Sequence, residues 1–151
     1  QNDSASWGTM FRCLTVNETR RNETTKTVWS QFVFQNASSE GNETFTVTEK
    51  VEAVKHYNYT NHTNAIKYTL ANGTQLVDPL VFSDGKICDL FYAPYADNGT
   101  GGYELWVNSD HIDQIPSCCN FMLEFFAGTN RKVYNIYDKK KCEFVGKQAK
   151  K

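Results

Sequence analysis

Three carboxylic acids fall on strand faces that should be apolar, and their types and positions suit the binding of a small organic cation. Glu49 lies between Val47 and Val51 in an alternating segment, so a period of two turns it to their side. The same alternation places two more acids among apolar or aromatic residues: Asp89 with Ile87, Phe91 and Ala93, and Glu104 with Trp106. A buried carboxylate is costly unless it is paired. An ammonium would pair with these acids, and the rings would contact its organic part.

Each acid taken alone has a simpler explanation. An ion pair with a lysine or arginine also stabilises a carboxylate on an apolar face. In the segment around Asp89, a register shifted by one residue would turn Cys88, Leu90 and Tyr92 inward instead. Periodicity alone leaves the ligand cavity and these alternatives open.

Motifs for catalysis and for metal binding are absent from the sequence. It has no Cys-x-x-Cys, no Gly-x-Ser-x-Gly and no phosphate loop, and the glycines at 99, 101 and 102 precede no helix. His56, His62 and His111 are scattered in polar surroundings, and the adjacent Cys118 and Cys119 do not have metal-ligand spacing. We therefore expect a binding protein with no enzymatic activity, no cofactor and no metal.

Short alternating segments dominate the chain and predict about eight strands. They are 11–16, 27–35, 44–54, 65–70, 76–82, 86–93, 103–107 and 132–137. Turn sequences separate them, among them Asn72-Gly73 and Asp84-Gly85. This regular spacing is typical of an antiparallel barrel or sandwich.

One helix is predicted between Pro116, which fits a first helical turn, and Gly128, a plausible C-terminal stop. Apolar residues recur there at helical spacing: Ile115, Cys118, Cys119, Met122, Leu123 and Phe126. Strands followed by one helix and a last strand are the element order of a lipocalin. We therefore predict an all-β, eight-stranded antiparallel lipocalin barrel with one C-terminal α-helix packed on the outside. A sandwich with an appended helix is the alternative.

Length and charge limit the class of protein further. With 151 residues and no linker or repeat, residues 1–151 form one predicted domain. A net charge of −1 argues against nucleic-acid binding, and no apolar run approaches the ~20 residues that span a bilayer. The basic residues at 139–141, 147, 150 and 151 are interpreted as a solvated terminus.

The glycosylation signals indicate a secreted glycoprotein. Nine Asn-x-Ser/Thr sequons occur where chance gives roughly one. They begin at Asn2, Asn17, Asn22, Asn36, Asn42, Asn58, Asn61, Asn72 and Asn98. An Asn/Thr-rich surface without sugar is the competing interpretation. Five cysteines fit two disulfides and one free thiol in an oxidising compartment. With no signal peptide visible, Gln1 is interpreted as the start of a mature chain.

Several of these residues together resemble a known family, the tick salivary lipocalins that bind biogenic amines. Their motif is Cys-Asp-aliphatic, a variable hairpin, Glu-Leu-aromatic and a downstream Cys, matched here by Cys88-Asp89-Leu90, Glu104-Leu105-Trp106 and Cys118-Cys119. The similarity covers nearly the whole chain and includes Trp7-Gly8, Phe11-Arg12-Cys13, Phe32-Val33-Phe34, Thr48-Glu49-Lys50-Val51 and Ile115-Pro116. The resemblance implies a secreted, monomeric scavenger that sequesters histamine or serotonin from the host.

The resemblance also implies roles for individual residues. Asp89 and Glu104 match the amine-binding carboxylates, and Trp106 matches the ring contact. Glu49 and Tyr68 match positions that line a second, upper pocket in two-site histamine binders, and Trp7 matches a cavity-lining aromatic residue. Two departures favour a single site. Only six residues precede Trp7, where relatives carry a capping helix with acidic ligands, and Leu76 stands where two-site relatives tend to have an aromatic ring.

The disulfides that the resemblance implies are Cys13–Cys142 and Cys88–Cys119, with Cys118 free. Cys118 and Cys119 point about 100° apart on a helix, so only one of them can meet Cys88. Cys119 lies nearer the middle of the apolar stripe and matches the family's spacing after Ile115-Pro116.

Two other functions are compatible with the same fold. A binder of a lipid mediator such as leukotriene or thromboxane would need a basic cavity, and the acidic inward faces argue against it. An inhibitor of a host defence protein would act through surface loops, whose partners sequence patterns do not reveal.

Overall fold

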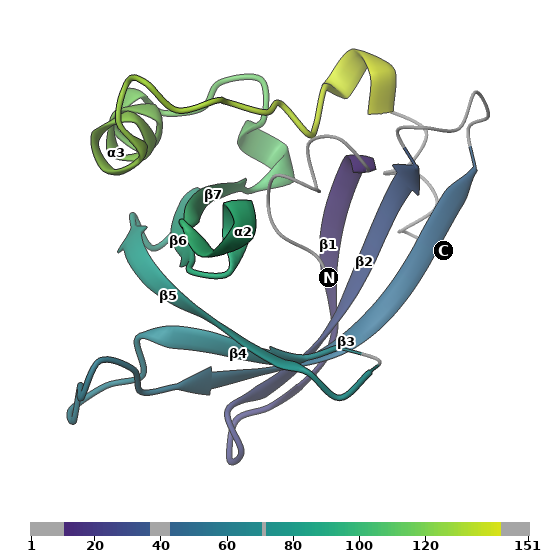
Figure 1. Ribbon diagram of the computed structural model, residues 1–151. Coiled ribbons are helices and arrows are strands. Elements are labelled where there is room, and N and C mark those ends of the chain that lie inside the picture. Colours follow the sequence, from purple (N-terminus) through teal and green to yellow (C-terminus); the bar gives the residue numbers. More distant parts are fainter. Residues whose placement is uncertain (1–10, 37–42, 71, 143–151) are drawn as a thin grey trace.

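The computed structural model describes residues 11–36, 43–70 and 72–142, and this part of the chain is built around one antiparallel sheet (Figure 1). Seven strands follow in chain order: β1 (Phe11–Asn22), β2 (Thr27–Asn36), β3 (Thr44–Val54), β4 (Ala65–Thr69), β5 (Gln75–Ser83), β6 (Cys88–Ala93) and β7 (Gly102–Val107). Each strand pairs with the next, so the spatial order is the chain order. The all-β class and the alternating segments are as predicted.

The sheet curls so that β6 and β7 face β1 and β2 across an interior (Figure 1). A ring contact crosses that interior, because Phe32 on β2 and Trp106 on β7 meet edge to face with centroids 6.5 Å apart. Phe32 and Trp106 therefore lie on the inner face of the sheet. Because cross-strand partners share a face, the strand pairings then identify the other inward residues.

The predicted eighth strand is not formed. Residues 132–137 contain no strand, and one backbone hydrogen bond, from the Cys13 nitrogen to the Ile136 oxygen (2.7 Å), joins them to β1. Cys13 has a left-handed backbone with φ of 57°, and the β1–β2 register shifts between Arg12 and Thr15. This irregularity interrupts the regular hydrogen-bonding pattern that a further ladder would need.

The helical content also exceeds the prediction. The expected helix is α3 (Ser117–Ala127), and the described residues add a short turn, α2 (Ala96–Gly99), the 3-10 turn η1 (Ser109–His111) and a helical turn at residues 139–142. None of the described helices has the length and hydrophobicity needed to cross a membrane.

Helix α3 packs on the outer face of β6 and β7, as Figure 1 shows. Leu90 on β6 and Cys119 on α3 are both 0 % exposed, and Cys119 is joined to Cys88 of β6. Leu90 and Cys88 therefore form the outer row of β6, which settles the choice that periodicity left open. The alternate residues of β6, Asp89 and Phe91, lie on the inner face.

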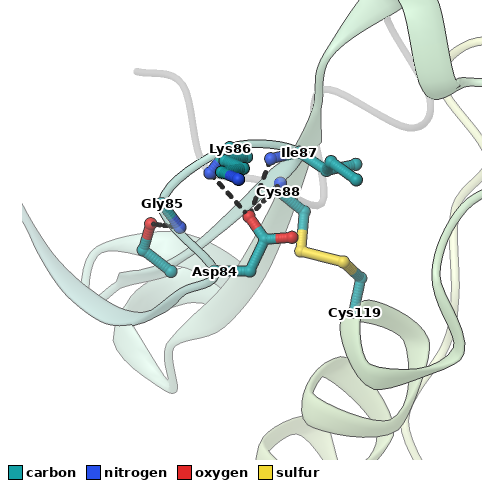
Figure 2. The surroundings of a disulfide bond; sticks show 7 residues. Asp84, Gly85, Lys86, Ile87, Cys88 and Cys119 are labelled. Atoms are coloured by element: carbon teal, nitrogen blue, oxygen red, sulfur yellow. Dashed lines mark hydrogen bonds between the residues drawn. A yellow bond between two sulfur atoms is a disulfide. The ribbon is translucent and has the colours of Figure 1, made fainter.

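The structure joins Cys13 to Cys142 and Cys88 to Cys119, the two pairs that the resemblance implies, and Cys118 is free and exposed. Beside the second bond, one oxygen of Asp84 accepts hydrogen bonds from the backbone nitrogens of Lys86, Ile87 and Cys88 at 2.7–3.1 Å (Figure 2). This carboxylate holds the turn that leads into β6.

Gly101 supports the β6–β7 connection, and its replacement should destabilise the fold. Its φ is +86°, and an added Cβ would overlap the Tyr92 ring. We expect Gly101→Ala to lower the free energy of unfolding by about 2–4 kcal/mol, the sum of backbone strain and overpacking. Gly99→Ala is the matched control, since Gly99 has φ of +88° and open space around it. Urea titrations that gave equal losses for both variants would contradict the role of the Tyr92 contact.

Candidate functional site

A row of acids lies on the inner face of the curled sheet. Tyr68 pairs with Leu76, which shares its face with Asp78 and Leu80 two and four residues on. Leu80 pairs with Phe91, and Phe91 pairs with Glu104. Asp89, two residues before Phe91, lies on the same face and pairs with Trp106. On β3, Val51 pairs with Tyr68, and Glu49 lies on the same face as Val51 because it is two residues away. The strand pairings therefore gather Glu49, Asp78, Asp89 and Glu104 on one inner surface.

Asp78 is the most enclosed of these acids, with only 3 % of the residue exposed. Its Oδ2 accepts hydrogen bonds from the hydroxyls of Tyr68 (3.0 Å) and Tyr95 (3.1 Å), and the two hydroxyls also contact each other. Its Oδ1 is buried and has no hydrogen-bond partner. Burial raises the pKa of Asp78 to about 6, against the opposing effect of the two tyrosine hydrogen bonds.

Glu104 is the second shielded acid. Burial, with a further contribution from the charge of nearby Asp78, raises the pKa of Glu104 to about 7. The indole Nε1 of Trp106 donates a hydrogen bond to its Oε2 at 3.3 Å. None of the ion pairs within residues 11–36, 43–70 and 72–142 includes Asp78 or Glu104. The two acids are therefore shielded from water without a cation from this part of the chain.

The remaining two acids lie in less enclosed positions. Glu49 is half-buried opposite Ser30, and desolvation raises its pKa. Asp89 is exposed and lines an open cleft of about 490 Å³ together with Ser83, Lys86, Trp106 and Asn108. Trp106 thus borders this cleft and also touches Glu104.

The structure places most of the predicted site residues on this surface. Asp89, Glu104, Trp106, Glu49 and Tyr68 all lie on the inner face. Trp7 lies outside the described residues. The roles of these residues in binding remain predictions. The predicted pair of carboxylates was Asp89 and Glu104, but the acid whose charge acts on Glu104 is Asp78, and Asp89 is exposed.

Sequence reasoning missed Asp78 and Tyr95. Asp78 carries the signal used for the other acids, because it alternates with Leu76 and Leu80 within a strand. Tyr95 carries no such signal: it follows β6 at the start of α2, and only the folded chain brings its hydroxyl to Asp78.

This arrangement suits cation binding better than catalysis or metal binding. Four carboxylates and two phenols face the interior, with an aromatic ring beside them. In the described part of the chain, the one cluster with metal-ligand proximity is Asp84, Cys88 and Cys119. Both of its thiols are used in the disulfide, so it offers no thiolate ligand.

Comparisons with known proteins agree with the fold and with the motif. The family model described as tick histamine binding protein matches residues 1–144. A male-specific histamine-binding salivary protein of Rhipicephalus appendiculatus is 36 % identical over 95 % of this chain and 71 % of its own length. The female-specific histamine-binding protein 1 of the same tick is 38 % identical, over 81 % of this chain and 62 % of its own length.

The chain thus spans between about three fifths and seven tenths of the relatives that it matches. The matched residues include both disulfides, the acidic inner face and helix α3. By its sequence match over nearly its whole length, the chain belongs to the tick histamine-binding protein family.

Proposed function

We propose that this protein is a salivary scavenger that binds a biogenic amine, histamine in preference to serotonin, inside the curled sheet. The observation that carries the proposal is the pair Asp78 and Glu104, two shielded acids without a basic partner among the described residues. A buried acid pair needs a counter-charge, and a primary ammonium supplies one together with three hydrogen-bond donors. The histamine-binding names of the relatives support the choice of ligand.

The geometry suggests how an amine would be held. The unpartnered Oδ1 of Asp78 offers an acceptor, and Glu104 adds the second negative charge. The Trp106 indole, between Glu104 and the open cleft, would contact the ligand's ring. Asp89 at the cleft would attract the cation or bind the far end of the ligand. Such a scavenger acts by stoichiometric binding, so it needs no reactive group.

Isothermal titration calorimetry with histamine tests this function. We expect one amine per chain, because Leu76 stands opposite Tyr68 where two-site relatives tend to have a ring. Two thermodynamically distinct histamine sites would contradict the single site. Serotonin binding tighter by tenfold, about 1.4 kcal/mol, would reverse the ligand order and leave amine scavenging intact. Binding of a leukotriene and of neither amine would overturn the proposal in favour of a lipid-mediator binder.

Secretion, glycosylation and a monomeric state belong to the same proposal. The sequon asparagines 17, 22, 58, 61, 72 and 98 are exposed, and Asn36 is partly buried at the end of β2. Asn2 and Asn42 lie outside the described residues. Exposed sequons suit the attachment of sugar in the secretory pathway, and the salivary origin of the first relative supports this route.

A further inference from the structure

The acid pair is placed so that its two carboxyl groups are not readily ionised together. Asp78 and Glu104 lie on the same inner surface, Asp78 buried and Glu104 partly buried, and the charge of Asp78 acts on Glu104. Two carboxylates in a common low-dielectric site repel each other when both are ionised. Without a cation, one of them relieves that repulsion by keeping its proton, as acid dyads do.

Among residues 11–36, 43–70 and 72–142, the other titratable groups on this surface do not supply a positive charge to the pair. From β3, β4 and β6 the pair is faced by Glu49, Tyr68 and Asp89, and Tyr95 reaches Asp78 from the start of α2. Lys50 and Lys67 lie on the outer face, paired with Glu52. On β1, the one inward basic residue, Arg21, is exposed and paired with Glu18 and Glu23. Lys86 borders the cleft beside Asp89 and is exposed.

We propose that below neutral pH the empty site holds one proton on the Asp78–Glu104 pair, and that the ammonium of a bound amine replaces this proton. The inference rests on the proposed function and adds its coupling to pH. In the exchange, one carboxyl O–H bond breaks, its electron pair stays on the oxygen, and the proton leaves to solvent. The site has a charge of −1 in both states: one acid and one carboxylate when empty, two carboxylates and one ammonium when loaded.

The hydrogen bonds indicate which acid holds the proton. Two tyrosine hydroxyls donate to Oδ2 of Asp78 and stabilise its ionised form. Glu104 receives one longer hydrogen bond, from the Trp106 indole. Glu104 is therefore the protonated partner, which agrees with its higher pKa of about 7, against about 6 for Asp78.

The exchange predicts a specific dependence of affinity on pH. Between the pKa of Glu104, about 7, and that of Asp78, about 6, each amine that binds must displace about one proton, so affinity falls by up to about tenfold for each unit of decreasing pH. Below both values a second proton must leave as well, and the affinity falls more steeply. Above the pKa of Glu104 both acids are already ionised, and the affinity stops changing until the amine itself loses its proton. The amine is therefore held most tightly at and above neutral pH.

Calorimetry in two buffers of different ionisation enthalpy measures the released protons directly. Serotonin is used beside histamine, because its ammonium and its phenol titrate far above neutral pH, near the usual lysine and tyrosine values. We expect close to one proton released per serotonin at about pH 6.5, midway between the pKa values of Asp78 and Glu104, and close to none at about pH 8.5. Binding without proton release at the lower pH would overturn the exchange and leave the proposed function standing. Absence of binding by both amines would overturn both.

Two Glu→Gln variants and one direct titration complete the test. Glu104→Gln should remove most of the proton release, leaving only the contribution of Asp78, whereas Glu52→Gln, on the outer face, should leave the release unchanged. Carbon-13 NMR of the carboxyl groups in the empty protein does not depend on binding by a variant. One glutamate signal, missing in Glu104→Gln, should titrate near pH 7 and move to its ionised position when amine is added at about pH 6. A spectrum in which every carboxyl group is ionised at that pH would overturn the proposal.

Discussion

The double variant Asp78→Asn with Glu104→Gln is expected to bind histamine at least about 100-fold more weakly than the natural chain, a loss of about 2.7 kcal/mol. The amides keep the shape of both side chains and remove both charges. A buried ammonium then loses its counter-ions, while the desolvation cost of burying it remains. Calorimetry at about pH 8 measures the effect, since both acids of the natural chain are then largely ionised.

Single variants separate the shielded acids from the exposed one. Glu104→Gln and Asp78→Asn should each weaken binding more than about tenfold, because Asp78 is buried and Glu104 is partly buried and desolvated, so water screens both charges less than it screens Asp89. Asp89→Asn should cost less than about tenfold, because Asp89 is exposed at the cleft. Glu52→Gln, on the outer face, serves as the control. Unchanged affinity in a folded double variant would exclude the Asp78–Glu104 site, and a dominant effect of Asp89→Asn would move the ammonium to the cleft.

The Cys13–Cys142 disulfide should contribute more to stability than the Cys88–Cys119 disulfide. It joins residues 129 apart, whereas Cys88–Cys119 joins residues 31 apart. In the chain-entropy model, closing the longer loop is worth about 5 kcal/mol and closing the shorter one about 4 kcal/mol. We therefore expect the Cys13→Ser, Cys142→Ser variant to lose most of the stability of a typical domain of this size. Urea unfolding monitored by tryptophan fluorescence measures the loss.

Cys118→Ser is the control for this experiment. Cys118 is free and exposed, so its replacement should change the free energy of unfolding by less than about 0.5 kcal/mol. The buried position of Cys13, Val33 and Cys142 adds lost packing to the entropic effect of opening the long bond. If the Cys13→Ser, Cys142→Ser variant lost less than about 1 kcal/mol of its free energy of unfolding, this bond would not constrain the unfolded chain as the chain-entropy model assumes.

Local alternation predicted the seven strands because a half-buried strand shows its period in its own residues. β3 was predicted with the bounds that the structure has, Thr44–Val54. β1 continues to Asn22, beyond the predicted end, through residues that are polar and exposed and therefore carry no apolar alternation. The prediction of an eighth strand was wrong for a different reason. Residues 132–137 alternate as a strand does, but a strand also needs a regular partner edge, and β1 is irregular at Cys13.

The sequence by itself determined which acids share a face with hydrophobes, because side-chain direction in a strand follows from residue parity. It also determined the all-β class, the position of helix α3 and, through the family resemblance, the cysteine pairs and the amine motif. Only the tertiary structure decided that Cys88 and Leu90 face α3, which turns Asp89 and Phe91 inward. Only the tertiary structure brought Asp78, Tyr95 and Glu104 into one site, because strand pairing and burial depend on contacts between residues far apart in the chain. Those contacts also set the pKa values on which the proposed proton exchange depends, since desolvation arises only when the whole sheet has curled.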